Sequence, residues 1–371
     1  MKFIVDKEAF FSGLKIVERA TVAKGLQPVL ANILIESISS DTLKLTATNF
    51  DLTVVTTINA QVEAEGRVTL PAKKLSDIIS RLGNAPINFD IDENSMAIIT
   101  SGKSKFDIIG ISAAEFPNVE DKVPTGESIE IEMKPFVTCA KMTNFAAAGY
   151  ETNNLLSGVI CSINDKILEM ASTDGNRLAR AKEFVKNDEN KEFSMIVPSR
   201  VLSEFIKMTA YVEEENIIVA KEKSRIIFQT GSTKLISRLM EGQYPKYNQL
   251  IPTSFAKQAL VNREKLISGL EIVSTMINEK TNIIKFEFTD GVLKMNADGS
   301  DAGASEDKIE ISYSGEDMLI AFNYKYLLEF LKIAEVEEVL IQMNTNLTAA
   351  VLRPKSEEDY LYLIMPVQIR V

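Results

Sequence analysis

Two short segments contain residue types that bind phosphate or metal ions in other proteins. Gly102-Lys103-Ser104 matches the end of a phosphate-binding loop, but that loop requires a glycine where Ala97 stands. The apolar sequences at 97–100 and 106–109 favour two strands joined by a hairpin turn over a strand, a loop and a helix. The acidic stretch 298–307 lacks the carboxylate spacing and the central glycine of a calcium-binding loop. Both segments are therefore interpreted as solvated turns.

The residue types that catalysis most often needs are absent or scarce. The 371 residues include no histidine, which excludes Ser-His-Asp and Cys-His nucleophiles and histidine-ligated zinc. Cys139 and Cys161 are too few and too far apart for a zinc knuckle or a disulfide framework, and they fit a reducing compartment. We therefore predict no catalytic residue, no cofactor and no metal. An enzyme that uses the carboxylates of 298–307 with a metal ion stays open as an alternative.

The charge balance restricts how the chain can meet a polyanion. Its 41 basic and 52 acidic residues give a net charge of −11, so the chain as a whole repels nucleic acid and anionic membranes. Any contact with DNA would need basic groups gathered on one shielded face. The apolar run at the N-terminus is too short for a signal peptide, and no stretch approaches the roughly 20 apolar residues of a membrane span. We expect a cytoplasmic protein with no membrane partner.

The elements that position these residues recur three times along the chain. An amphipathic helix is expected at 6–17 and again at 262–273, with a weaker middle copy at 134–142. A second helix follows in each copy, and so does a strand that runs into a polar turn. The second helices are expected at 70–79, 197–206 and 322–331, and the strand–turn segments at 43–49, 168–174 and 293–299.

Alternating segments between the helices complete each repeat. The sequences 87–92, 129–133 and 308–312 alternate apolar and polar residues, which is typical of strands with one buried face. Each repeat is therefore expected to hold two short helices among about eight strands, an α+β class in which helices cover one face of antiparallel sheets. Proline with threonine, serine or glycine near 122–126 and 251–254 predicts the boundaries. The predicted domains are 1–124, 125–253 and 254–371.

Two features break the threefold pattern and are candidates for function. Thr173-Asp174-Gly175-Asn176 predicts a hairpin turn, but the following Arg177-Leu178 has no counterpart in the first and third repeats. A feature elaborated in one copy of a repeat is a candidate binding site. At the C-terminus, Pro366 should interrupt the last strand and leave apolar neighbours partly unpaired, which indicates a binding surface.

With these motifs in order, the chain resembles the bacterial sliding clamps, the beta subunits of DNA polymerase III. The resemblance runs over the whole chain and is carried by Thr46–Asn49, Leu70–Lys74, Ser101–Phe106, Ala114–Asn118, Thr173–Ala179, Gly242–Tyr247, Phe322–Asn323 and Met365–Pro366. It implies three clamp domains per chain and a head-to-tail homodimeric ring of six similar domains. Such a ring is not an enzyme. It encircles duplex DNA without reading its sequence and tethers the replicative polymerase.

The resemblance also implies the partners and three sets of site residues. The implied partners are double-stranded DNA, the polymerase III alpha subunit, the clamp loader, other clamp-binding replication and repair proteins, and a second copy of the chain. The predicted pocket for partner peptides comprises Leu156, Thr173, Gly175, Arg177, Leu178, Pro245, Leu250, Asn323, Tyr326, Leu347, Met365, Pro366 and Val367. The DNA-facing set comprises Lys24, Lys73, Lys74, Arg81, Lys141, Arg200, Lys207 and Lys325. The dimer contact is expected to bring Phe106 against Thr275 and Met276.

Within the pocket, Leu178, Pro245, Leu347 and Met365 are expected to form apolar walls, and Arg177 a polar group at the rim. Asn176 and Gln249 differ from residues found in some relatives, so the preference for partners can differ too. A peptide-binding scaffold built from repeats, which never encircles DNA, stays open as the alternative function.

Overall fold

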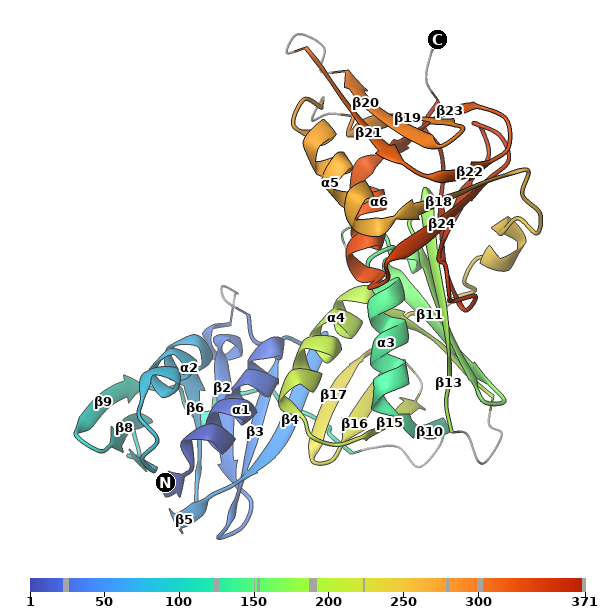
Figure 1. Cartoon of the computed structure of the whole chain (residues 1–371). Coiled ribbons are helices and arrows are strands. Elements are labelled where there is room, and N and C mark those ends of the chain that lie inside the picture. The colour runs from blue at the N-terminus through green and yellow to red at the C-terminus, as the bar shows by residue number, and fades with distance from the viewer. Residues whose placement is uncertain are drawn as a thin grey trace. The chain divides into compact units, whose positions relative to one another are not determined.

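The computed structural model describes residues 1–22, 27–122, 127–149, 151, 154–186, 192–222, 224–277, 281–298 and 303–368. These residues form six α-helices and 26 β-strands (Figure 1). Two compact units emerge, one built from residues 1–133 with 201–239 and the other from 134–200 with 240–371. The second predicted repeat is therefore divided between the two units. The predicted domain limits at 124 and 253 stay a prediction.

All six helices lie where the repeated motifs predict them. They are α1 (Lys7–Val17), α2 (Ala72–Arg81), α3 (Met133–Asn144), α4 (Ser199–Met208), α5 (Arg263–Ser274) and α6 (Tyr324–Ile333). Short polar side chains cap three of them, because each accepts hydrogen bonds from backbone N–H groups of the first turn. Asp6 caps α1, Asn262 caps α5 and Asn323 caps α6. Local sequence therefore determines where these helices begin.

The first unit contains two antiparallel sheets. The five-stranded sheet has the order β5 (Gln61–Ala64), β1 (Lys2–Val5), β7 (Ile87–Ile91), β8 (Met96–Ser101) and β9 (Ser104–Ile109). The eight-stranded sheet has the order β10 (Glu127–Glu132), β15 (Asn216–Glu222), β16 (Arg225–Thr230), β17 (Thr233–Arg238), β4 (Leu52–Asn59), β3 (Thr42–Thr48), β2 (Asn32–Ser37) and β6 (Arg67–Pro71). Because β17 pairs with β4, strands of the first and second repeats share one sheet.

The second unit repeats this arrangement one domain later. Its nine-stranded sheet has the order β14 (Phe193–Pro198), β11 (Gly158–Asn164), β12 (Ile167–Thr173), β13 (Arg177–Phe184), β26 (Tyr360–Ile364), β25 (Ala350–Pro354), β24 (Glu338–Met343), β18 (Lys257–Asn262) and β22 (Ser312–Ser314). Its four-stranded sheet has the order β21 (Ala304–Glu310), β20 (Val292–Asp298), β19 (Ile283–Thr289) and β23 (Met318–Asn323). Here β13 pairs with β26, so the second and third repeats share a sheet.

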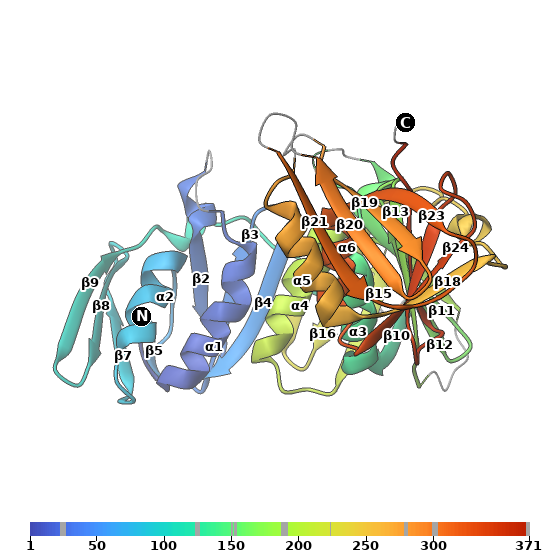
Figure 2. The ribbon, with the colours of Figure 1, turned by 45° about the horizontal axis from the view of Figure 1, so that its top comes forward.

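The helices cover one face of these sheets, as the α+β prediction requires. In the first unit α1 and α2 lie side by side over the sheet that contains β2, β3 and β4 (Figure 2). Phe10 and Leu14 of α1 are fully buried there, and the Phe10 ring meets the edge of Phe89. Cys139 and Cys161 are buried in the second unit, where burial raises the pKa of the Cys161 thiol to about 12. Both thiols are therefore unreactive packing groups.

The two segments with possible chemistry are turns. Gly102, with φ +56°, lies in the hairpin between β8 and β9, so Gly102-Lys103-Ser104 is no phosphate-binding loop. The acidic stretch 298–307 runs from the end of β20 into β21, and residues 299–302 lie outside the described part of the chain. Among the described residues, no group of three or more acidic or cysteine side chains is placed to hold a metal ion. No helix of this part is long and apolar enough to cross a membrane.

Candidate functional site

Hydrogen bonds from two side chains fix the backbone of the turn between β12 and β13. The Thr173 hydroxyl donates to the carbonyl of Arg177 and accepts from the N–H of Gly175. Asp174 Oδ1 accepts from the N–H groups of Asn176 and Arg177, at 2.9 and 3.1 Å. Gly175 adopts φ +91°, a left-handed conformation that favours glycine. The predicted hairpin is confirmed, and its side chains fix the position of Arg177.

The first repeat contains the same turn, but with a large side chain at the position of the glycine. Thr48 and Asn49 make the corresponding bonds to residues 50–52. Phe50 stands in place of Gly175, with φ +72° and a 54% exposed side chain. A Cβ placed on Gly175 would meet nothing within 4 Å. The middle repeat therefore leaves open space where the first repeat projects an aromatic ring.

Arg177 is buried beneath this turn, although a group at the polar rim was expected. Its side chain is engaged on every side: Nε donates to Asp174 Oδ2 at 3.0 Å, Nη1 to Glu329 Oε2 at 2.6 Å and Nη2 to the carbonyl of Phe145 at 2.8 Å. The guanidinium carbon lies 4.2 Å from the ring centroid of Tyr326. Only 7% of the residue is exposed, so Arg177 ties the turn to α6 and to the end of α3.

The charge of Arg177 survives this burial. Desolvation lowers its pKa, but the neighbouring Tyr362 and Glu329 raise the pKa more, so the net shift is upward. Arg177 therefore remains a cation, and it acts as a fixed support for the turn.

The C-terminal segment reaches the same end of the sheet. Strand β26 ends at Ile364, and the N–H of Met365 then donates to the carbonyl of Asn176 at 2.8 Å. Two residues later the N–H of Val367 donates to the carbonyl of Ala321 at 2.8 Å, next to the start of α6. Between these two bonds, Pro366 has no backbone N–H to donate and interrupts the strand pairing, as predicted. The β12–β13 turn, residues 365–367 and the first turn of α6 thus come together.

Buried apolar side chains support this end of the sheet from below. Leu178 pairs across the sheet with Thr173 and with Leu363 of β26, and it packs in a cluster with Tyr244. The Tyr244 hydroxyl accepts from the N–H of Thr173 at 3.3 Å and donates to the carbonyl of Gly158 at 3.2 Å. The segment that connects the second and third repeats is therefore fixed against the sheet.

Three large apolar side chains among the predicted pocket residues remain exposed. Leu250, Leu347 and Met365 are 59%, 63% and 43% exposed. Leu347 lies in the turn between β24 and β25, and Met365 follows β26, the strand that pairs with β25. Large exposed apolar groups beside ordered polar ones are typical of a site that binds another molecule.

Comparison with known proteins decides the family. Patterns for the N-terminal, central and C-terminal domains of the DNA polymerase III beta subunit match residues 1–120, 130–246 and 248–368. The chain belongs to the DNA polymerase III beta subunit family. The beta sliding clamps of Synechococcus elongatus and Synechocystis sp. are 35% and 33% identical to it, and each alignment covers all of both chains.

Solved structures of the beta subunit family share the fold. The crystal structure of the DNA polymerase III beta subunit from Thermotoga maritima matches all of both chains, with a TM-score of 0.92 at 25% identity. A sliding clamp from Pseudomonas aeruginosa bound to griselimycin matches with a TM-score of 0.90 at 25% identity. The resemblance and the fold class of three α+β clamp domains are confirmed. As a family member the chain is a sliding clamp of DNA replication and not an enzyme.

The predicted pocket residues fall into two groups in the structure. In the first group, hydrogen bonds, strand pairing or a cation–π contact join Thr173, Gly175, Arg177, Leu178 and Tyr326 directly. Met365 and Val367, with Pro366 between them, bond to Asn176 of the same turn and to Ala321, two residues before Asn323. The second group, Leu156, Pro245, Leu250 and Leu347, lies on connecting segments. Four further residues contact this group but were not predicted from the sequence: Leu363, Tyr244, Phe145 and Glu329. The alternation of the last strand could have identified Leu363, but no sequence signal marks Glu329.

The predicted DNA-facing residues are exposed on helices. Lys73, Lys74 and Arg81 lie on α2, Lys141 on α3, Arg200 and Lys207 on α4, and Lys325 on α6. Lys207 pairs with Glu204 at 2.9 Å, whereas the other six make no ion pair with any described residue. Lys24 lies outside the described residues. Unpaired basic groups on helix surfaces are available to phosphates.

The predicted dimer residues lie at two sheet edges. Phe106 is half-buried on β9, an edge strand of the first unit. Ile109, the last residue of the same strand, is 72% exposed. Thr275 and Met276 directly follow α5 in the second unit, where α5 packs beside the edge strand β21. An edge strand presents unpaired N–H and C=O groups, so each edge can accept another strand.

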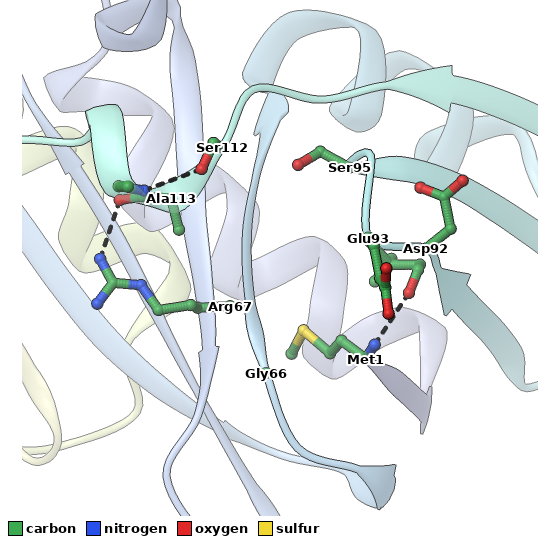
Figure 3. Close-up of a pocket in the computed structure, with 10 residues that line it drawn as sticks. Met1, Gly66, Arg67, Asp92, Glu93, Ser95, Ser112 and Ala113 are labelled. Carbon is green, nitrogen blue, oxygen red and sulfur yellow. Dashed lines mark hydrogen bonds between the residues drawn. The ribbon is translucent and has the colours of Figure 1, made fainter.

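A cavity of about 420 Å³ in the first unit has mixed polar and apolar walls (Figure 3). Three of its polar residues already have partners: the Met1 ammonium donates to the carbonyl of Ile91, Arg67 to that of Ala113, and Asp92 accepts from two backbone N–H groups. The other lining residues are Gly66, Glu93, Ser95, Ser112 and Ala114. The bonds of this cavity therefore serve the fold.

Proposed function

We propose that two copies of the chain close head to tail into a ring that encircles duplex DNA and tethers replication proteins. The observation that carries this proposal is the match of all three beta subunit domains along the chain, together with full-length beta sliding clamp relatives. In this ring the repeats 1–124, 125–253 and 254–371 would each supply one of the three domains of a subunit. The protein would work in the cytoplasm, where bacterial DNA is replicated.

The basic residues on the helices would hold DNA loosely. Lysine and arginine side chains meet phosphates through counterion release and bridging water, without reading bases. The exposed positions of Lys73, Lys74, Arg81, Lys141, Arg200 and Lys325 support this assignment. The net charge of −11 means that the rest of the surface repels DNA. Ring closure, and not affinity, would then keep the protein on DNA.

The predicted pocket would receive a short peptide from each partner. Apolar anchors of an extended or turn-like segment would pack on the exposed Leu347 and Met365, above the buried Leu178, and a few backbone bonds would fix its direction. The open space beside Gly175 and the exposed apolar side chains support this role. The polymerase III alpha subunit, the clamp loader and other clamp-binding replication and repair proteins would compete for this pocket.

The ring would close where an edge strand of one subunit meets an edge strand of the next. Pairing of β9 with β21 of a second copy would satisfy the backbone groups of both edges. Phe106 would pack against Thr275 and Met276. Two such contacts are equivalent by the twofold symmetry of a dimer.

Absolute mass and DNA topology test the ring together. At low micromolar concentration, light scattering should give twice the 41.2 kDa of one chain, and small-angle scattering should give the distance distribution of a hollow annulus. A ring loaded on closed circular DNA should stay bound and should be lost when the circle is cut. A protein that binds partner peptides but dissociates equally from closed and cut circles would be the repeat-built scaffold instead.

Substitutions test the dimer contact and the pocket separately. Phe106→Asp should give a monomer, because it places a charge at an apolar contact, whereas Ile38→Asp, an exposed apolar residue of the same unit, should remain a dimer. Leu178→Ala combined with Met365→Ala should abolish peptide binding and leave the dimer intact. Ile163→Ala combined with Ile167→Ala, a buried and an exposed residue of the same sheet, is its matched control. A dimeric Phe106→Asp protein would place the contact elsewhere.

A further inference from the structure

Two arginines lie on one face of the nine-stranded sheet, away from the helices. Arg180 of β13 pairs with Leu361 of β26, and the register of β26 with β25 brings Arg353 opposite the same leucine. Because side chains alternate along a strand, both arginines share the face of Leu178 and Leu363. Their backbones lie two strand spacings apart, each of about 4.8 Å, and at this separation two arginine side chains are long enough to meet above Leu361.

Neither arginine has a counter-ion in the described part of the chain. Each is half-buried, and the Nε of each is fully buried without a hydrogen-bond partner. No described carboxylate forms an ion pair with either one, in contrast to Arg177 and Arg225, which each contact two carboxylates. A buried donor without an acceptor is costly, and so are two cations side by side.

The nearby acidic groups do not neutralise the pair. Glu169 already accepts from the Tyr247 hydroxyl and lies 3.1 Å from Lys182 Nζ. Glu358 is exposed in the turn after β25 and makes no ion pair with a described residue. Burial lowers the pKa of Arg353, and the charge of Arg180 lowers it further, while Glu358 opposes both effects. The cluster therefore retains unbalanced positive charge.

We propose that Arg180 and Arg353 form a binding site for a phosphate group, either inorganic phosphate or the phosphoryl group of a nucleotide. Two guanidiniums carry a charge of two, which a phosphate dianion matches and a single carboxylate does not. Guanidinium forks bind phosphate oxygens through paired N–H bonds, here those of the terminal nitrogens, which are not among the buried donors without a partner. The site is separate from the predicted pocket and independent of ring formation.

Thermal unfolding with inorganic phosphate tests the site, with sodium chloride holding the ionic strength constant. Phosphate should raise the melting temperature of the intact protein and of Arg225→Met, an arginine that already has carboxylate partners. Arg180→Met and Arg353→Met keep most of the buried stem, and each should weaken phosphate binding by at least about tenfold. Without phosphate, both variants should melt no lower than the intact protein.

A parallel titration with adenosine monophosphate distinguishes the two sources of phosphate. Tighter binding of the nucleotide, lost in Arg180→Met and Arg353→Met, would identify a nucleotide site. Equal or weaker binding with the same loss would identify free phosphate. An equal rise in melting temperature in all four proteins, or no rise beyond that given by chloride, would overturn the proposal.

Discussion

At the residue scale, one glycine distinguishes the turn of the proposed pocket from the same turn in the first repeat. Thr48 and Thr173 organise the same hairpin turn, so the offset of 125 residues seen in the sequence corresponds to matching hydrogen bonds. The sequence predicts this turn because its bonds are local. It could not predict the burial of Arg177, because Glu329 and the carbonyl of Phe145 approach from distant segments.

Phe50 holds an unfavourable backbone conformation, and relieving it should stabilise the protein. A non-glycine residue at φ +72° costs roughly 1–2 kcal/mol, whereas asparagine tolerates this region better. Phe50→Asn should therefore raise the free energy of unfolding by about 1 kcal/mol and the melting temperature by about 2–4 °C. Ile38→Asn removes a similarly exposed apolar side chain where no positive φ exists, and it should give no gain. Equal melting temperatures would mean that the turn carries no strain.

Arg177 should contribute strongly to stability because its removal leaves polar groups without partners. Arg177→Met deprives Asp174 and the Phe145 carbonyl of their donors, at a cost of about 2–3 kcal/mol. Glu329 is half-exposed and can return to water, so Glu329→Gln should cost less than about 1 kcal/mol. The midpoints of urea unfolding compare the two variants. Similar midpoints for both would show that the buried bonds contribute little.

At the scale of elements, the sequence predicted the helices and hairpins but not the joining of repeats. Capping residues and periodicity are local signals, which is why α1, α5 and α6 begin where predicted. The pairing of β17 with β4 and of β26 with β13 joins strands far apart in the sequence. Pairing between distant strands leaves no periodic signal in the sequence, so only the family resemblance could predict that neighbouring repeats share a sheet.

The connector after the first repeat is fixed by charge, which makes it sensitive to acid. Asp121 Oδ2 lies 2.7 Å from Lys44 Nζ, and Lys234 donates to the Asp121 carbonyl at 2.8 Å. Burial raises the pKa of Asp121, but Lys44 and Lys234 lower it more, so its net shift is downward. The carboxylate therefore stabilises the fold above the unfolded pKa of about 3.9, and this contribution disappears as the pH falls through the folded pKa.

Asp121→Asn should accordingly melt below the intact protein at pH 7, and the gap should close below about pH 4. Melting temperatures measured from pH 7 to pH 3 test this dependence. Asp317→Asn, an exposed carboxylate without an ion pair among the described residues, is the matched control and should show no such gap. A gap that stays constant with pH would assign the loss to packing instead of charge.

At the scale of the whole molecule, an acidic chain that holds DNA must separate its charges. The net charge of −11 coexists with basic residues on α2, α3, α4 and α6 that make no ion pair with any described residue. Composition alone could not reveal this distribution, because the helices also carry acidic residues such as Asp77, Glu204 and Glu329. The repeat supplied the missing information, since it places basic side chains on corresponding helices.

The helix lysines should therefore affect the salt dependence of DNA binding more than retention on a circle. Lys73→Gln, Lys74→Gln and Lys141→Gln together remove three charges, and each lost phosphate contact lowers the slope of log affinity against log salt by about 0.9. Binding to short linear duplex, measured from low to moderate salt, should show the shallower slope.

Retention on closed circular DNA should be unchanged, because a closed ring cannot slide off a circle. The control, Lys2→Gln with Lys166→Gln and Lys355→Gln, removes the same number of charges outside the helices and should keep the original slope. An unchanged slope in the helix variant would remove these lysines from the DNA path, whereas rapid loss from closed circles would show that affinity, and not topology, retains the protein.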